Sequence, residues 1–317
     1  MRIRILGSAA GGGFPQWNCN CPNCRGFRSG AARFRARTQS SICVTDGEAA
    51  RGGEAARGGE AARWVLVNAS PDIRAQLQAN PDLQPNRALR DSALAAVVLV
   101  DGQVDHTTGL YMLRESTRPW PLWCTDSTHA DLTRGNPIVS VLAHFCGVDR
   151  RRIELDRPFR IEEVGALRWR ALPVASKPAP YSPHREAPVP GDNIALVIED
   201  EASGRHVVYA PGLGAVDERL WEFMQSAACV LIDGTFWSDE EMIRLGVSRK
   251  RARDLGHLPQ SGPDGMLGWL ERLPAAVRRV LIHINNTNPI LDEESAEFAE
   301  LGRRGIEVAQ DGMEIAS

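Results

Sequence analysis

The chain contains 317 residues, of which 43% are hydrophobic and 24% charged, and its 37 Lys and Arg against 40 Asp and Glu give a net charge of −3. This apolar fraction is typical of a soluble globular protein and excludes a disordered chain. The near-neutral charge gives no bulk attraction to nucleic acid or to an anionic membrane, so we expect neither as a partner. No apolar run is long enough to span a bilayer, and the stretch before Gly11 is too short for a signal peptide. We therefore expect no membrane insertion and a cytoplasmic location.

In the first half of the chain, strand-like segments come before helical ones. Alternating or continuous apolar patterns predict strands at Arg2–Leu6, Gln39–Thr45, Trp64–Asn68, Ala93–Val100 and Leu122–Thr125. Helical patterns follow at Asp72–Ala79, Thr107–Arg114 and Pro137–Cys146. The second and third strands form a hairpin, and a GEAARG repeat at 47–63 lengthens its loop. That repeat has no apolar face, so we interpret it as a solvated low-complexity insert.

The second half repeats the order of strands and helices. Strands are predicted at Leu167–Pro173, Asn193–Glu199, His206–Tyr209, Cys229–Ile232, Val280–His283 and Ile306–Ala309. Helices are predicted at Ala215–Gln225, Asp239–Leu245, Met266–Arg272 and Glu293–Leu301. Two such runs predict an α/β protein in which two sheets pack face to face with helices outside, a four-layer αββα sandwich. No break in composition divides the chain, so we expect a single domain over residues 1–317.

Three of the seven cysteines lie within six positions, in Cys19-Asn-Cys21-Pro-Asn-Cys24. Thiolates at this spacing bind Zn²⁺ tetrahedrally, and an odd number of cysteines argues against a disulfide framework. We predict a structural zinc site that fastens this loop to the core and takes its fourth ligand from elsewhere; three reduced cysteines are the alternative. The other cysteines stand singly in apolar surroundings and are expected to be buried thiols: Cys43, Cys124, Cys146 and Cys229.

Polar side chains follow the continuous apolar strand directly. They are Asp101, Gln103, Asp105 and His106. In layered α/β proteins the site usually lies where strands end in such groups. Asp105 and His106 are both able to bind one metal ion, and a solvated turn with an Asp helix cap is the alternative.

Two later strands end in the same way. Asp233 closes the strand at 229–232 and His283 closes the strand at 280–283, while His257 lies in a loop between Gly and Pro. A single histidine is more often a hydrogen-bonded core or loop residue than a ligand. Three strand ends carrying Asp and His nevertheless favour one shared site.

These features together resemble the metallo-β-lactamase superfamily, and within it the pyrroloquinoline quinone (PQQ) biosynthesis protein B family. The resemblance covers nearly the whole chain outside the insert. The segments that carry it are FPQWNCNCPNC, NASPDIRAQL, DHTTGL, GDNIAL, YAPGL, LIDGTFW, GHLPQSG and LIHINNTNPIL. The superfamily implies the same αββα sandwich that the order of strands and helices predicts.

The resemblance also identifies ligands that this chain lacks. Hydrolytic members carry H-x-H-x-D-H, whereas Asp101 and Gln103 stand at the first two of those positions here. A further histidine and a bridging aspartate of those members have no counterpart in segments 173–177 and 209–212. The first of the two metal sites of the hydrolases is therefore expected to be missing.

The ligands that remain are Asp105, His106 and His283. Two histidines and one carboxylate on a single ion are the pattern of non-haem Fe(II) oxygenases, although one zinc ion can also activate water. The family resemblance implies a role in PQQ biosynthesis. We therefore expect Fe(II)- and O₂-dependent hydroxylation of the tyrosine ring in a small Glu-Tyr-type, peptide-derived PQQ precursor.

The neighbouring polar residues receive supporting roles. His257 and Asp233 are expected to relay protons or orient the substrate, and Asp101 and Gln103 to support the ligands or face the substrate. Asn286 occupies the position where a related phosphodiesterase branch has a zinc-binding histidine, so it is a candidate fourth ligand of the cysteine site.

Two other functions stay open. One is a single-zinc hydrolase, against which the missing histidines count. The other is a soluble carrier in the transport of PQQ or its precursor to the periplasm, for which the Arg-rich stretches Arg25–Arg37 and Arg249–Arg253 offer positive charge; ordinary surface charge is the simpler reading of both. A homodimer is a candidate assembly.

Overall fold

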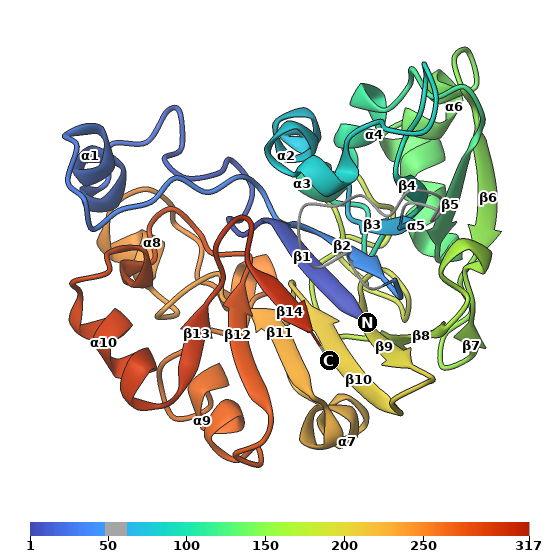
Figure 1. The fold of residues 1–317 in the computed structure, drawn as a ribbon. Helices are drawn as coiled ribbons and strands as arrows, with labels where there is room; N and C mark the ends of the chain where they lie inside the picture. Colours follow the sequence, from blue (N-terminus) through green and yellow to red (C-terminus); the bar gives the residue numbers. More distant parts are fainter. Residues whose placement is uncertain (48–61, 317) are drawn as a thin grey trace.

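A computed structural model describes residues 1–47 and 62–316. It contains two seven-stranded sheets, ordered β14-β1-β2-β3-β4-β5-β6 and β13-β12-β11-β10-β9-β8-β7 (Figure 1). The first comprises β14 (Glu314–Ala316), β1 (Arg2–Gly7), β2 (Ser41–Thr45), β3 (Trp64–Val67), β4 (Leu94–Val98), β5 (Trp120–Cys124) and β6 (Val148–Arg152). The second comprises β13 (Ile306–Val308), β12 (Arg278–Ile282), β11 (Cys229–Asp233), β10 (Arg205–Ala210), β9 (Ile194–Asp200), β8 (Leu167–Pro173) and β7 (Pro158–Phe159).

Helices cover the outer face of each sheet. The α-helices are α1 (Pro22–Arg28), α2 (Ile73–Ala79), α3 (Val104–Thr107), α4 (Gly109–Met112), α5 (Asp126–Ala130), α6 (Ile138–Leu142), α7 (Glu218–Ser226), α8 (Glu241–Arg244), α9 (Met266–Glu271) and α10 (Ala296–Arg303). Short 3₁₀ or π turns lie at Pro81–Leu83, Asp131–Gly135, Glu162–Val164, Arg253–Leu255 and Pro289–Leu291. Among the described residues, no helix has the length and apolarity needed to cross a bilayer.

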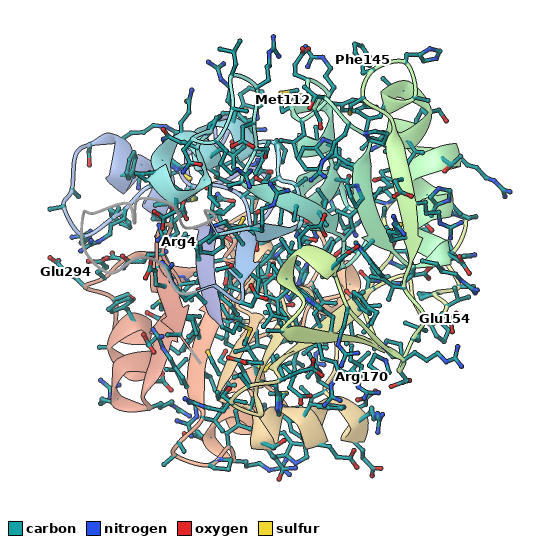
Figure 2. The ribbon with its side chains drawn as sticks, turned by 45° about the vertical axis from the view of Figure 1, so that its right-hand side comes forward. Arg4, Met112, Phe145, Glu154, Arg170 and Glu294 are labelled. Carbon is teal, nitrogen blue, oxygen red and sulfur yellow. The ribbon has the colours of Figure 1, made fainter. Side chains whose placement is uncertain are left out.

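Three buried clusters hold these layers together. The central one joins the two sheets, with Ile5 and Val67 from the first packing near Trp169 and Leu231 from the second. The outer clusters attach α2, α4 and α6 to the first sheet and α7, α9 and α10 to the second. Charged side chains such as Glu154 and Glu294 lie at the periphery (Figure 2). The predicted αββα sandwich is confirmed.

The differences from the predicted elements have local causes. The helix predicted from Ala215 begins at Glu218, because the Asp217 carboxylate accepts a hydrogen bond from the Leu220 amide at 2.8 Å and so forms the N-cap. The helix predicted at 107–114 is two short helices, α3 and α4. Strand β6 escaped prediction because its sequence, VDRRR, is mostly exposed and has no apolar alternation.

The predicted hairpin is present, since β2 and β3 pair antiparallel with Ile42 opposite Val67. The GEAARG repeat between them falls largely on residues 48–61, outside the described part of the chain.

At one edge of the sandwich, backbone bridges link the two halves of the molecule, and the polar strand ends lie there. Strands β3 to β6 run parallel within the first sheet, as do β10 to β13 within the second, so the carboxyl ends of each set lie at one edge of their own sheet. Bridges between Ala9 and Ile284 and between Asp101 and Asn193 link the two halves there. Chemistry-bearing side chains from distant parts of the sequence are thereby brought together.

Candidate metal centre

Asp105, His106 and His283 converge at the edge where the two sheets meet. Asp105 and His106 lie in α3, and His283 follows β12. Asp105 Oδ2 lies 3.3 Å from His283 Nε2 and 3.9 Å from His106 Nε2. One ligand atom from each residue lies within 4.8 Å of the other two. This spacing allows one ion to contact all three side chains.

His106 is oriented for binding a cation. Its Nδ1 lies 2.9 Å from both carboxylate oxygens of Asp101, whereas its Nε2 is buried and has no hydrogen-bond partner. A buried polar atom without a partner carries a desolvation penalty of about 1–3 kcal/mol. A metal ion at Nε2 removes that penalty, and a carboxylate on the opposite ring nitrogen is the usual support for a metal-binding histidine. The donor set therefore fits an Fe²⁺ or Zn²⁺ ion.

His283 is held by Thr235 in a strained backbone conformation. Its φ angle is +62°, in the left-handed region, which costs a non-glycine residue about 1–3 kcal/mol. The Thr235 hydroxyl oxygen lies 2.9 Å from the His283 carbonyl oxygen and 2.9 Å from His283 Nδ1, from which it accepts a hydrogen bond. These contacts leave Nε2 facing Asp105. Strain of this kind is common at functional sites.

Asp233, His257 and His283 form a second group with metal-ligand spacing, but the Asp233 carboxylate is already saturated. Its Oδ1 accepts from the amide and hydroxyl of Thr235 at 2.9 and 2.6 Å, and its Oδ2 accepts from the Leu213 amide at 2.8 Å. Oδ2 also lies 2.7 Å from His257 Nδ1. Asp233 therefore anchors His257, whose ring stacks on His283 at 5.5 Å.

The electrostatics of this region favour positive charge. Burial lowers the pKa of His106, but the Asp101 and Asp105 carboxylates outweigh burial and raise it to about 9. Burial raises the pKa of Asp105, but His106 and His283 together hold it well below its usual range. The pKa of His257 is also raised, because Asp233 outweighs the effect of burial. Such a group of residues binds either protons or a metal cation.

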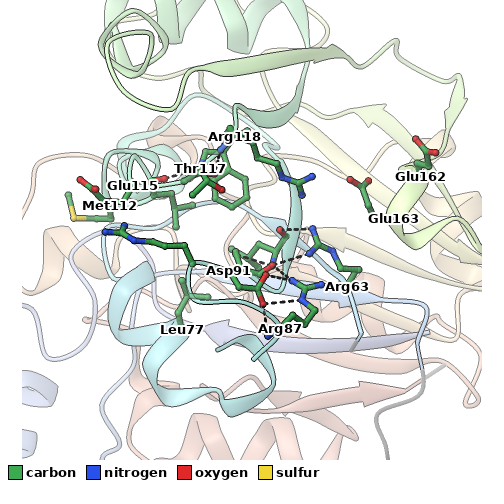
Figure 3. Close-up of a pocket in the computed structure, with 16 residues that line it drawn as sticks. Arg63, Leu77, Arg87, Asp91, Met112, Glu115, Thr117, Arg118, Glu162 and Glu163 are labelled. Atoms are coloured by element: carbon green, nitrogen blue, oxygen red, sulfur yellow. Dashed lines mark hydrogen bonds and ion pairs between the residues drawn. The ribbon is translucent and has the colours of Figure 1, made fainter. Parts of the chain in front are cut away.

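Asp105, His106 and His283, hereafter the triad, line a cavity of about 270 Å³. Gly11, from the glycine-rich turn, forms part of its wall, and a Cβ atom there would lie 3.2 Å from Asp105 Oδ2. Gln103 also lines the cavity, and its side-chain amide donates to the Lys177 carbonyl at 3.1 Å. A larger surface hollow of about 840 Å³ lies elsewhere, between Arg63, Arg118 and Glu163 (Figure 3). It contains none of the triad residues.

The cysteine loop forms a separate candidate zinc site. The sulfur atoms of Cys19, Cys21 and Cys24 lie within 4.8 Å of one another, close to the roughly 3.8 Å of a tetrahedral Zn–thiolate site. Burial raises the pKa of the Cys21 thiol to about 12, so a cation is needed to hold it as thiolate.

The candidate fourth ligand of the cysteine site lies beside these sulfurs. The side-chain nitrogen of Asn286 is 3.6 Å from Cys21 Sγ and 3.5 Å from Cys24 Sγ. Zinc binding by Asn286 requires its amide to turn so that the oxygen faces the sulfurs. Asn23 attaches the loop further, donating to the Asn286 and Asn288 carbonyls at 3.1 and 2.9 Å.

The structure thus brings Asp101, Gln103, Asp233 and His257 around the triad, and Asn286 beside the cysteines. Sequence reasoning missed Thr235, although it stands in the quoted segment LIDGTFW. It also missed Lys177 and Arg185, which line the cavity. No strand pattern marks these two, because they lie in the long loop between β8 and β9.

Comparisons with known proteins identify relatives over the whole chain. A beta-lactamase superfamily domain model matches residues 63–284. The chain is 58% identical over 316 residues to coenzyme PQQ synthesis protein B of Azoarcus sp. (strain BH72), with 100% of both chains covered. It is 55% identical to the protein of the same name in Pseudomonas fluorescens (strain Pf0-1), with 99% of both covered.

Solved structures support the same assignment. The Zn²⁺-bound PqqB from Methylobacterium extorquens is 38% identical and superposes with a TM-score of 0.87, covering 100% of both chains. A diphosphatase of the PhnP family, 16% identical with a TM-score of 0.66 over 100% of this chain and 97% of its own, shares the fold. With more than half of its residues identical to its full-length relatives, the chain belongs to the coenzyme PQQ synthesis protein B family of the β-lactamase superfamily.

Proposed function

We propose that the chain acts in PQQ synthesis as an Fe(II)- and O₂-dependent hydroxylase of the tyrosine ring in a small Glu-Tyr-type precursor. The triad carries the proposal: two imidazole nitrogens and one carboxylate face one point, while the nearby Asp233 carboxylate is saturated. Two histidines and one carboxylate with open positions are typical of non-haem Fe(II) oxygenases. When bound, a ferrous ion supplies the binding and activation of O₂.

The side chains around the triad have distinct tasks in this proposal. Asp101 accepts from His106 Nδ1 and so keeps Nε2 free for the ion. Thr235 does the same for His283. His257, fixed at Nδ1 by Asp233, lines the cavity, and in this proposal its Nε2 donates a hydrogen bond to the phenol oxygen of the substrate.

The overall reaction replaces a ring C–H bond by C–OH. One oxygen atom of O₂ enters the ring, and the other leaves as water. Formation of that water consumes two electrons and two protons, which an external reductant such as ascorbate supplies. The side chains of the site therefore need only position the ring and hold protons near the phenol oxygen.

The test is to load the protein anaerobically with Fe(II), add a Glu-Tyr peptide and ascorbate, admit O₂, and measure oxygen uptake and product mass. We expect uptake matched by a mass gain of one oxygen atom. A His283→Ala variant should lose both, whereas a His144→Ala variant, altered at an exposed histidine outside the cavity, should retain both. Uptake no greater than that of His283→Ala would refute the oxygenase.

A zinc hydrolase is the second candidate, because the relative from Methylobacterium extorquens is described as Zn²⁺-bound. One zinc ion on the same triad would activate water for attack on a peptide or ester. Zinc-dependent cleavage of the peptide in the same assay, without oxygen uptake, would favour this reading. Tight binding of PQQ without turnover would instead favour a carrier.

A further inference from the structure

Lysine is rare in this chain. Of the 37 Lys and Arg residues only two are lysines, Lys177 and Lys250. Lys250 is exposed, whereas Lys177 lines the cavity that holds the metal triad. In a chain that uses arginine almost everywhere else, the lysine at the cavity wall supplies a compact ammonium group where a longer, planar guanidinium would fill more of the space.

A second cation accompanies it. Arg185 comes from the same loop, lines the same cavity, and donates a hydrogen bond to the Pro178 carbonyl. No carboxylate oxygen in residues 1–47 and 62–316 lies within 4.0 Å of the charged nitrogens of either side chain. Half-buried Arg168, by contrast, is paired with Glu199 at 2.6 Å. Lys177 and Arg185, hereafter the cationic pair, thus face the cavity without a counterion from the described chain.

The backbone that carries Lys177 is fixed on two sides. Gln103 donates to its carbonyl at 3.1 Å, and the neighbouring Ser176 hydroxyl donates to the Gly256 carbonyl at 2.8 Å. Gly256 has φ +91°, and a Cβ atom there would lie 2.4 Å from the Lys177 amide nitrogen. The close contact with Gly256 therefore fixes the backbone of Lys177, and Gly256 directly precedes His257 in the chain. A fixed position reduces the entropy lost on binding a ligand.

The charges of the cavity favour an anionic ligand. Two carboxylates line it, Asp101 and Asp105, and both face His106. A divalent ion on the triad together with the cationic pair outweighs them, which leaves a positive surplus. Phe236 adds an apolar surface to the same wall. The cavity of about 270 Å³ lies just below the roughly 300–1,000 Å³ of typical ligand pockets, so it suits a small molecule only.

We propose that the cationic pair is a recognition site for substrate carboxylates, so that the cavity selects a small aromatic molecule with at least two carboxylates. The inference rests on the proposed function for the identity of the reacting ring, but the binding it describes requires no turnover. Lys177 and Arg185 each bind a carboxylate oxygen through charge-assisted hydrogen bonds. They act as specificity-determining residues that place the aromatic ring toward Asp105, His106 and His283.

Binding is tested in the absence of O₂ with zinc-loaded protein, by calorimetric titration. The probes are the Glu-Tyr dipeptide, which has two carboxylates, and Gln-Tyr amide, which has none. We expect Lys177→Gln and Arg185→Gln each to weaken Glu-Tyr binding by roughly 10- to 100-fold and to leave Gln-Tyr amide unaffected. The Lys250→Gln control should bind as wild type, and metal content and thermal unfolding verify that each variant is folded and loaded.

Chemical labelling gives a second readout without any mutation. Reductive methylation with formaldehyde and cyanoborohydride, followed by mass spectrometry, reports the accessibility of both lysines in one sample. We expect Glu-Tyr to slow the labelling of Lys177 several-fold and to leave Lys250 unchanged. Equal slowing of both, or of neither, would contradict the proposed contact.

The two proposals fail in different ways. Equal affinity of wild type for the acid and the amide probes, including no measurable binding of either, would overturn the cationic pair whatever the oxygen assay shows. Carboxylate-dependent binding that disappears in Lys177→Gln, in a protein that takes up no oxygen, would support the cationic pair and refute the hydroxylase.

Discussion

The hydroxyl group of Thr235 connects the residues of the metal centre, and Thr235→Val removes it with little change in shape. The side chain is 2% exposed. Its oxygen lies 2.6 Å from Asp233 Oδ1, 2.9 Å from His283 Nδ1 and 2.9 Å from the His283 carbonyl oxygen. The substitution therefore leaves buried polar atoms on both neighbours with fewer partners, without opening a cavity.

The magnitude follows from these contacts. Loss of the hydrogen bond to the Asp233 carboxylate costs about 1.5–3 kcal/mol, and the buried His283 Nδ1 left without its acceptor adds a further penalty. We expect the free energy of unfolding to fall by about 3 kcal/mol. Because Thr235 also orients His283, a proposed metal ligand, the affinity for metal should fall roughly 10- to 100-fold.

Urea unfolding measures the first effect, and competition with a chromophoric chelator measures the second. Thr235→Ser keeps the hydroxyl group and should retain most of both properties, which separates loss of the hydroxyl from loss of the methyl group. If Thr235→Val bound zinc as tightly as wild type, the hydroxyl would not orient His283, and the argument would be refuted.

Three further predictions concern groups around the two candidate metal sites. Asp101→Asn replaces the charged acceptor of His106 Nδ1 with a neutral one, so chelator competition should show metal affinity roughly 10- to 100-fold lower; unchanged affinity would contradict the orienting role. Cys21→Ser should lose one zinc per chain by elemental analysis and unfold at lower temperature; loss of activity with intact folding and zinc would argue against a structural site. Burial raises the pKa of Glu241 from 4.5 to about 7. The folded state therefore binds this proton more tightly than the unfolded chain does. The free energy of unfolding should fall as pH rises from about 4.5 to 7, by at most about 3 kcal/mol. Urea unfolding at pH 5 and pH 8 should show that Glu241→Gln loses this decline, and an identical decline in the variant would assign it to other groups.

The sequence was informative where apolar strands end in polar residues. The convergence of Asp105 and His283 could be predicted, because each comes after a buried apolar strand and the parallel strands of a layered sheet place such ends on one edge. Strand order and helix patterns likewise predicted the αββα layers. Edge strand β6 was not predictable, since its exposed Arg150–Arg152 stretch carries no periodic apolar signal.

The contacts that support the triad and the cavity could not be predicted from the sequence, for a different reason. Thr235 touches His283 across 48 positions, and Gln103 touches the Lys177 carbonyl across 74. No local pattern encodes contacts of this range, because they depend on how two sheets and their loops pack. The cationic pair is equally hidden, since Lys177 and Arg185 are ordinary loop residues until the fold brings the loop to the cavity.

The two residues that depart from the hydrolytic pattern acquire other functions in the fold. Asp101 stands where hydrolytic members of the superfamily carry a histidine, and here its carboxylate holds His106 Nδ1 at 2.9 Å. Gln103 stands at the second such position and supports the loop of Lys177 through its amide. Restoring histidine at either position would therefore break an existing contact before it could supply a ligand. The arrangement around the triad is therefore consistent with a single ion. Asp101 orients His106, a proposed ligand of that ion, and Gln103 supports the loop that carries the cationic pair.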